Sequence, residues 1–343
     1  MSTHHARPIS RRRFLGGLTL VGTAGLLRLA PRSVAAAPPP ETTTLRLAYH
    51  SRSLCHAPLY VAQELLQGEG FTEVQYVKTS PRVERDLAAG QVDIVTHFCG
   101  PLTIQVDQGD SLVLLAGLHP GCVELFGTAA IRSIGDLKGK TVAVTDVGGG
   151  RHAFLAVMAA YVGLDPRKDM HIVGHPAAEA MQLLAEGKID AFLAAPPDAQ
   201  EFRAKAQQIG HVVVNSMLDR PWSQYFCCLV AGNREFSRQH PVATKRALRA
   251  ILKAVDRCAR EPERVARFLV DHGYAKQYDS ALQAMQEMGM GYRRWREYDP
   301  EDTVRFYALR LHEVGMVTST PQKIIDQGTD WRFLNELKQE WKG

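Results

Sequence analysis

Two loops in this sequence carry residue types that suit the binding of a small anion. One is Ser51-Arg52-Ser53-Leu54-Cys55-His56, after an apolar strand, and the other is Gly148-Gly149-Gly150-Arg151-His152, between a strand and a helix. Free N–H groups at a helix start favour negative charge, and a guanidinium binds a carboxylate or sulfonate through two parallel hydrogen bonds. We therefore predict that Arg52 and Arg151 hold an anionic group. The alternatives are that both arginines are solvated at the surface and that the glycine run is a plain connector.

Further imidazole, thiol and aromatic side chains extend this candidate site. His97-Phe98-Cys99-Gly100-Pro101 caps another apolar strand, and Trp222 and Tyr225 precede a later one. Trp222 and Phe226 are equally compatible with a structural role in a hinge core. The predicted ligand-binding residues are Arg52, Ser53, Cys55, His56, His97, Phe98, Cys99, Gly149, Gly150, Arg151, His152, Trp222 and Tyr225.

The same regions are rich in soft metal ligands. Cysteine and histidine bind zinc, copper or iron, but no C-x-x-C spacing occurs, and a buried cysteine is usually a small apolar residue. We therefore predict no metal and no cofactor, with a metal or haem carrier as an alternative. The soft ligands are Cys55, His56, His97, Cys99, His119, Cys122, His152, Cys227 and Cys228.

Catalytic and nucleotide-binding motifs are missing from the sequence. No G-x-S-x-G elbow occurs, and the neighbours Cys55 and His56 would point in opposite directions on an extended loop. Gly139-Lys140-Thr141 matches the end of a phosphate loop, but Ile134 occupies the position of the required first glycine, and the triplet precedes a strand. We predict no catalytic residue.

Residues 1–37 have the composition of an export signal. Ser10-Arg11-Arg12-Arg13-Phe14-Leu15-Gly16 is a twin-arginine motif, a glycine-rich apolar stretch follows, and Val34-Ala35-Ala36-Ala37 is a small-residue cleavage zone. The apolar stretch is shorter than the roughly 20 residues that span a bilayer, which disfavours a membrane anchor. We predict twin-arginine export to the periplasm, cleavage near Ala36 or Ala37, and a linker at 38–44.

Charge and cysteine content narrow the function classes. The chain has 41 basic and 36 acidic residues, and six of the arginines lie in residues 1–37, which hold no acid. The remaining chain therefore has a formal charge of about −1, which excludes an electrostatic nucleic-acid site. The length of the chain after residue 37 suits two domains. The six cysteines show no disulfide framework, so their pairing stays open.

The chain contains an internal repeat. Leu87-Ala88-Ala89-Gly90-Gln91-Val92-Asp93-Ile94 recurs as Leu184-Ala185-Glu186-Gly187-Lys188-Ile189-Asp190-Ala191, 97 residues later. Each copy indicates a helix end, a glycine stop and a strand start, and the Val/Ile-rich strands without alternation favour parallel sheets buried on both faces.

The repeat predicts two βαβαβ units followed by a helical C-terminus. The chain passes from the first unit to the second once and returns to the first once. Strands are predicted near 45–50, 73–78, 92–97, 112–118, 122–128, 140–145, 170–174, 189–193 and 225–231. Helices are predicted near 58–67, 81–89, 150–162, 177–186, 241–260, 262–272, 300–314 and 330–342.

Three further stretches carry a family resemblance. They are Ser133-Ile134-Gly135-Asp136-Leu137-Lys138-Gly139-Lys140-Thr141-Val142-Ala143-Val144, Ala159-Ala160-Tyr161-Val162-Gly163-Leu164-Asp165-Pro166 and Gly232-Asn233-Arg234-Glu235-Phe236. Together with the repeats, they resemble ABC-transporter substrate-binding proteins of the nitrate/sulfonate/taurine (NitT/TauT) type, in the NMT1/THI5-like superfamily. The resemblance covers nearly the whole chain after the signal.

The resemblance implies an α/β, type II periplasmic binding protein with two lobes joined by a two-strand hinge. We expect lobe 1 at 45–127 plus 229–343 and lobe 2 at 128–228, with ligand bound beyond the carboxyl ends of the strands. The expected function is a monomeric, non-catalytic receptor that delivers a small anionic or aromatic molecule to an inner-membrane ABC permease. The alternatives are a THI5-like cofactor-dependent pyrimidine synthase and a metal or haem carrier.

Overall fold

Two five-stranded sheets form the framework of the computed structural model, which describes residues 38–49, 53–206 and 210–342. The strand order is β2-β1-β3-β10-β4 in the first sheet and β7-β6-β8-β5-β9 in the second. The first contains β1 (Thr44–Tyr49), β2 (Glu73–Lys78), β3 (Ile94–Phe98), β4 (Leu112–Pro120) and β10 (Phe226–Asn233). The second contains β5 (Glu124–Gly127), β6 (Lys140–Val144), β7 (Met170–Gly174), β8 (Ala191–Ala194) and β9 (His211–Asn215). The predicted signal peptide lies outside the described residues.

The sequence repeat corresponds to the same local structure in both sheets. β1 pairs in parallel with β2 and β3, and β6 pairs in parallel with β7 and β8. Gly90 and Gly187 end the preceding helices with φ of +71° and +68°, a region that glycine enters without strain. Asp93 then accepts a backbone N–H of β1 at 2.7 Å, and Asp190 accepts one of β6 at 2.9 Å. Each repeat aspartate thus ties two neighbouring parallel strands together.

Each sheet receives one strand from the crossing that leads in from the other half. β5 follows β4 but pairs antiparallel with β8 and β9, whereas β10 follows β9 but pairs antiparallel with β3 and β4. The chain therefore changes sheets at Gly121–Val123 and again between Asn215 and Phe226. The first crossing lies four to six residues before the boundary expected at 127, and the second ends two residues before the boundary expected at 228.

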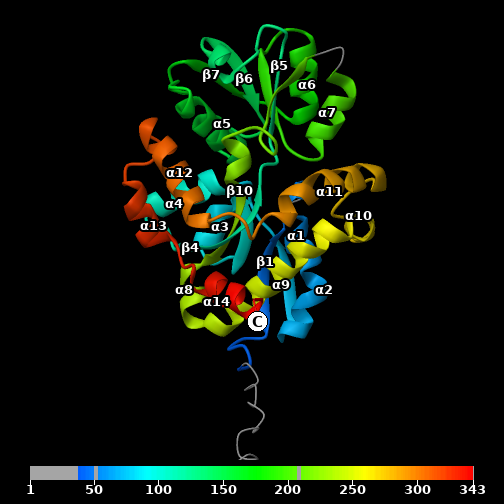
Figure 1. Ribbon diagram of the computed structural model, residues 1–343, viewed down its shortest axis with the longest axis vertical. Helices are drawn as coiled ribbons and strands as arrows, with labels where there is room; N and C mark the ends of the chain where they lie inside the picture. Colours follow the sequence, from blue (N-terminus) through cyan, green and yellow to red (C-terminus); the bar gives the residue numbers. More distant parts are fainter. Residues whose placement is uncertain (1–37, 50–52, 207–209, 343) are drawn as a thin grey trace, which may run out of the picture. The chain divides into compact units, whose positions relative to one another are not determined.

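Helices flank the two sheets (Figure 1). The first half contains α1 (Ala57–Val61), α2 (Gln63–Leu66), α3 (Val83–Ala88), α4 (Cys99–Asp107) and α8 (Arg234–Gln239). The second contains α5 (Gly150–Tyr161), α6 (Ala177–Ala185) and α7 (Asp198–Ala206). The C-terminal helices are α9 (Pro241–Arg260), α10 (Pro262–Asp271), α11 (Tyr278–Arg293), α12 (Pro300–Glu313), α13 (Pro321–Gly328) and α14 (Arg332–Glu340).

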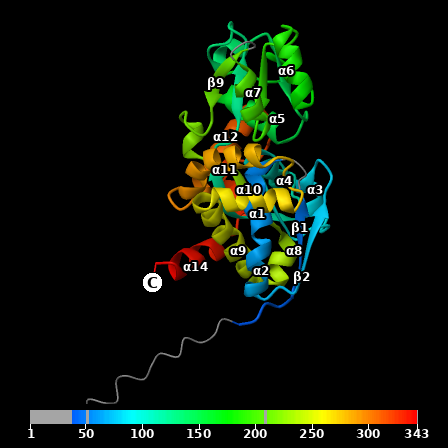
Figure 2. The same cartoon turned by 90° about the vertical axis from the view of Figure 1, so that its right-hand side faces the viewer.

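The C-terminal helices pack mainly around the first sheet, and two of them also reach the second half (Figures 1 and 2). α9 packs against α1, α2, α14 and β4. α12 contacts both α4 and α5, and α11 contacts α7. The helical C-terminus expected from the sequence is confirmed, and it joins the two halves in addition to the strand crossings.

Burial follows the apolar pattern of the strands. Every residue of β3, β4, β5, β8 and β10 is buried, in agreement with the predicted absence of inside–outside alternation. Within the described ranges, no helix has the length and apolar character needed to cross a bilayer.

Candidate functional site

The carboxyl end of β3 meets the start of α5, which brings two of the predicted loops together. A Cβ added to Gly150 would overlap the ring of Phe98, and one added to Gly100 would lie 2.7 Å from the Cβ of Ala153. The missing side chains therefore allow the first turns of α4 and α5 to touch. Phe98 and Gly150, both predicted site residues, lie on opposite sides of this contact.

Arg82 connects the halves at the same place, although the sequence analysis did not select it. Its guanidinium donates to the carbonyl oxygen of Gly148 and, at 3.0 Å, to that of Val147. Gly148 has φ of +86°, and a Cβ there would lie 2.5 Å from the guanidinium. Arg82 follows β2 and therefore lies in a third loop at the carboxyl edge of the first sheet. This position after a predicted strand could have identified it as a candidate site residue.

The two predicted histidines of the first half are buried beside Phe98. His56 Nδ1 lies 2.9 Å from Thr96 Oγ1 on β3, and both imidazoles approach the Phe98 ring edge-on. His97 Nε2 lies 3.3 Å from Glu84 Oε2 at the start of α3. Burial raises the pKa of Glu84, but the hydrogen bond and charge of His97 outweigh it, so the pKa lies below its ordinary value.

The start of α5 has no side-chain cap, because Gly149 occupies the N-cap position. His152 Nδ1 accepts the backbone N–H of Gly148 at 2.8 Å, which leaves the proton on Nε2 in the neutral ring. Burial, aided by the charge of Arg82 and opposed by that of Asp146, lowers the pKa of His152. The helix start thus offers backbone and imidazole N–H donors to a ligand, with the Asp146 carboxylate close by.

Arg151 lies in the second half, with its side chain 17% exposed. Its guanidinium donates to Thr145 Oγ1 and lies 3.7 Å from Asp198 Oδ2. Its buried Nε has no hydrogen-bond partner among the described residues. The distant carboxylate and the unused N–H leave Arg151 able to bind a further acceptor.

The remaining predicted residues take different positions. Arg52 lies outside the described residues, and Ser53 Oγ is 2.8 Å from Cys55 Sγ. Cys99 is fully buried, with Sγ 3.7 Å from Thr103 Oγ1, and burial raises its pKa to about 12. Its thiol therefore contributes to packing under α4.

Trp222 and Tyr225 form part of an aromatic cluster. The Trp222 ring packs edge-on against Tyr161 and Phe306, and Tyr225 stacks on Phe306 at 4.0 Å between ring centroids. Tyr161 ends α5, about 16 Å along the helix from its first residue. These contacts correspond to the hinge-core alternative for Trp222.

An open depression of about 400 Å³ lies near this end of α5. It is lined by Ala160, Tyr161, Gly163, Leu164, Asp165, Arg310, Glu313 and Val314. None of the predicted site residues lines it, and its Arg310 and Glu313 pair with each other at 2.8 Å. We therefore place the candidate site at the strand-end loops.

Two α/β halves, each contributing strand-end loops to their junction, form the two-lobed architecture of the periplasmic binding protein fold. The solved structure of the Candida albicans CA3427 gene product, described as having the generic periplasmic binding protein fold, is 14% identical. It has a TM-score of 0.64 and covers 84% of this chain and 96% of its own.

Two further solved structures share this fold. The periplasmic nitrate-binding protein NrtA from Synechocystis PCC 6803 is 17% identical with a TM-score of 0.69, covering 88% of this chain and 90% of its own. The alkanesulfonate-binding protein SsuA from Xanthomonas axonopodis pv. citri, bound to MOPS, is 16% identical with a TM-score of 0.62, covering 81% and 96%.

The chain belongs to the NMT1/THI5-like family, whose model matches residues 54–265, more than half of the sequence. The family membership and the fold expected from the sequence are thereby confirmed. No curated protein matches the chain in sequence.

Proposed function

We propose that the protein is the solute-binding receptor of an ABC importer and captures a small anionic or aromatic molecule between its two halves. The observation that carries this proposal is the junction of Phe98 and Arg82 from one half with the Gly148–His152 loop of the other. The fold, shared with nitrate- and alkanesulfonate-binding proteins, supports it.

The junction suits a closing mechanism. Ligand binds one half first, and contacts from the second half then stabilise the closed form. Arg82 contributes to this form by binding carbonyl groups of the opposite loop, while Arg151 and the uncapped start of α5 supply donors for an anionic group. Binding, orientation and release require no catalytic residue.

The proposal includes the cellular setting. After export and removal of residues 1–37, the chain acts as a monomer in the periplasm and delivers its ligand to an inner-membrane permease that recognises the closed form. A THI5-like synthase is the competing function, because the matching family model is described as NMT1/THI5 like.

A thermal-shift screen of the mature chain tests the proposal. Nitrate, small sulfonates, carboxylates, aromatic acids and pyrimidines are added singly, because a ligand of the folded state alone raises the melting temperature. At about 100 times its Kd, one ligand stabilises the fold by about 2.7 kcal/mol. We expect one chemical class to raise the melting temperature and to be recovered unchanged. Consumption of a pyrimidine precursor, or no stabilisation by any class, would contradict the proposal.

A further inference from the structure

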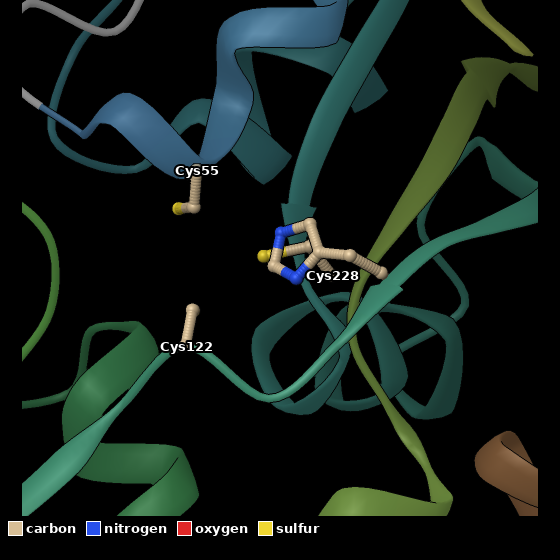
Figure 3. A group of neighbouring side chains, drawn as sticks. Cys55, Cys122 and Cys228 are labelled. Carbon is tan, nitrogen blue, oxygen red and sulfur yellow. The ribbon is translucent and has the colours of Figure 1, made fainter. Parts of the chain in front are cut away.

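A buried cluster of three cysteines and one histidine lies where the strand crossings meet. One potential ligand atom from each of Cys55, His119, Cys122 and Cys228 lies within 4.8 Å of the other three. Figure 3 shows the three cysteines, which come from three separate segments of the chain. All four residues are at most 4% exposed. His119 and Cys122 are three residues apart, but Cys55 and Cys228 lie far from them in sequence, so the fold assembles the group.

The backbone around the cluster explains why the side chains converge. Cys228 on β10 is the register partner of His119 on β4, so the two side chains share one face of the sheet. Cys122 follows β4 in the outward crossing, and its N–H donates to the buried Ser216 Oγ at 3.1 Å. The Cys55 carbonyl accepts a hydrogen bond from Tyr292 Oη at 3.0 Å. Hydrogen bonds thus hold the two loop cysteines in place.

His119 is oriented as a metal-binding imidazole. Its Nδ1 donates to the carbonyl oxygen of Gly121 at 3.0 Å, which leaves a lone pair on Nε2. His119 is fully buried, and no group within the described part of the chain hydrogen-bonds to Nε2. A buried acceptor without a partner costs about 1–3 kcal/mol, and a bound cation removes that cost.

The size of the cluster matches one tetrahedral ion. Zinc–sulfur bonds of about 2.3 Å place two thiolate sulfurs about 3.8 Å apart. The four ligand atoms now lie within 4.8 Å of one another, so they need to approach by only about 1 Å to bind one ion. Three thiolates and one imidazole form a ligand set of structural zinc sites.

We propose that Cys55, His119, Cys122 and Cys228 form a closed site for a single zinc ion at the hinge. Binding displaces the thiol protons, so three thiolates and the neutral imidazole hold the ion. The ion connects both halves of the hinge, through Cys122 and Cys228, to the loop that bears Cys55 and His56. It thereby sets the base of the candidate ligand site. This inference does not depend on the proposed function.

A disulfide is the competing fate of these thiols. Cys122 Sγ lies 3.3 Å from Cys227 Sγ, and oxidation of this pair would remove one zinc ligand. Cys227 is not one of the four proposed ligands. The Cys227→Ala variant therefore separates the two fates, since it keeps the zinc site and loses the disulfide.

Metal titration is the first test. The full mature chain, reduced with a phosphine in metal-free buffer, is titrated with Co²⁺ and then with Zn²⁺. We expect one equivalent of Co²⁺ to give thiolate charge-transfer and tetrahedral d–d bands, and one equivalent of Zn²⁺ to abolish them. Absence of these bands, or bands of an octahedral ion, would overturn the proposal.

Variants assign the ligands. Cys228→Ala and His119→Gln should each lower zinc affinity at least ~100-fold, since even groups that only orient a ligand are worth about 10- to 100-fold. Cys227→Ala should bind zinc like the wild type. Cys258→Ala is the matched control, because Cys258 is equally buried but lies on α9. Equal loss in this control, or loss in Cys227→Ala, would contradict the assignment.

X-ray absorption at the zinc edge needs no variant and remains decisive if the variants do not fold. The zinc-loaded wild type should show three sulfurs at about 2.3 Å and one nitrogen at about 2.0 Å. A shell of nitrogen and oxygen alone, or with two or fewer sulfurs, would overturn the proposal. The ligand screen on the same protein reports separately on the receptor function.

Discussion

Arg82 is the residue whose side chain most directly joins the two halves. It comes from the loop after β2 and donates to two carbonyl oxygens beside the glycine run of the other half. Gly148 accommodates it through a positive φ and the absence of a Cβ. One charged side chain and one missing side chain therefore create this contact together.

Replacing Arg82 with alanine should weaken ligand binding about 10- to 100-fold, because hydrogen bonds to a charged group contribute about 1.5–3 kcal/mol. Calorimetry with a compound from the ligand screen measures the loss. Arg85→Ala, which changes an exposed arginine on the adjoining helix α3, is the control. Equal affinities of wild type and Arg82→Ala would show that the contact does not stabilise the bound form.

Arg151→Ala should also lower affinity for an anionic ligand about 10- to 100-fold, while the free energy of unfolding changes little. The reason is that its nearest carboxylate is 3.7 Å away, which leaves its charge available to a ligand. Calorimetry and urea unfolding separate the two effects, with the exposed Arg132→Ala as control. If affinity is unchanged, the anion is bound elsewhere.

At the scale of elements, the amphipathic and apolar segments were predictable and several connecting elements were not. The repeat located β1, β3, β6 and β8, since its glycine stop and apolar strand are strong local signals. The sequence analysis missed α4, α7, α8, α11, α13 and β9. α4 starts at Cys99, directly after β3, so its Gly-Pro start was interpreted as a loop.

The sequence predicted which loops form the candidate site, but it predicted only some of the individual residues there. Strand ends predicted that Phe98, Gly150 and His152 lie at one edge, because parallel sheets align their carboxyl edges, and in the structure Phe98 contacts Gly150. The position of Trp222 depends on aromatic partners from α5 and α12, which lie far away in sequence. The cysteine–histidine cluster likewise depends on the fold, because only His119 and Cys122 are close in sequence, and Cys55 and Cys228 come from distant segments.

The contact of α7 with α11 should make stability depend on pH. Arg203 pairs with Glu287 at 2.5 Å and with Glu124 of β5 at 3.1 Å. Burial raises the pKa of Glu124 to about 7. The positive charge of Arg203 offsets only part of this rise, and the negative charge of Glu287 increases it. Between pH 4.5 and about 7 the unfolded carboxylate is ionised while the folded one stays protonated, so stability falls as pH rises.

Glu124→Gln should remove this fall. Above about pH 7 the variant should be more stable than the wild type by about 1–3 kcal/mol, and near pH 4 the two should differ little. Urea unfolding across this range measures the difference, with the exposed Glu263→Gln as control. Parallel pH profiles for wild type and variant would show that Glu124 titrates normally.

At the scale of the whole molecule, duplication and exchange explain the architecture. The first sheet takes β10 from the chain that returns through the second crossing, whereas all five strands of the second sheet lie between the two crossings. C-terminal helices then bridge the halves through α12. The cysteine–histidine cluster lies beside these crossings, with Cys122 in the outward one and Cys228 on β10.

Export is a prediction for the full chain, because it depends on residues 1–37. Changing Arg11 and Arg12 together to lysine should leave the precursor in the cytoplasm, because the twin-arginine pathway recognises that pair. Cell fractionation and immunoblotting measure the distribution, with Arg28→Lys as control. A normal periplasmic yield of the double variant would refute the predicted route.

Calorimetric titration of the mature chain with the best compound of the ligand screen tests the central claim, that this is a receptor closing on one small molecule. The account predicts one compound bound per chain, recovered chemically unchanged, with affinity reduced by Arg82→Ala and by Arg151→Ala but not by Arg85→Ala. Chemical conversion of the compound, or binding that neither site variant weakens, would contradict it.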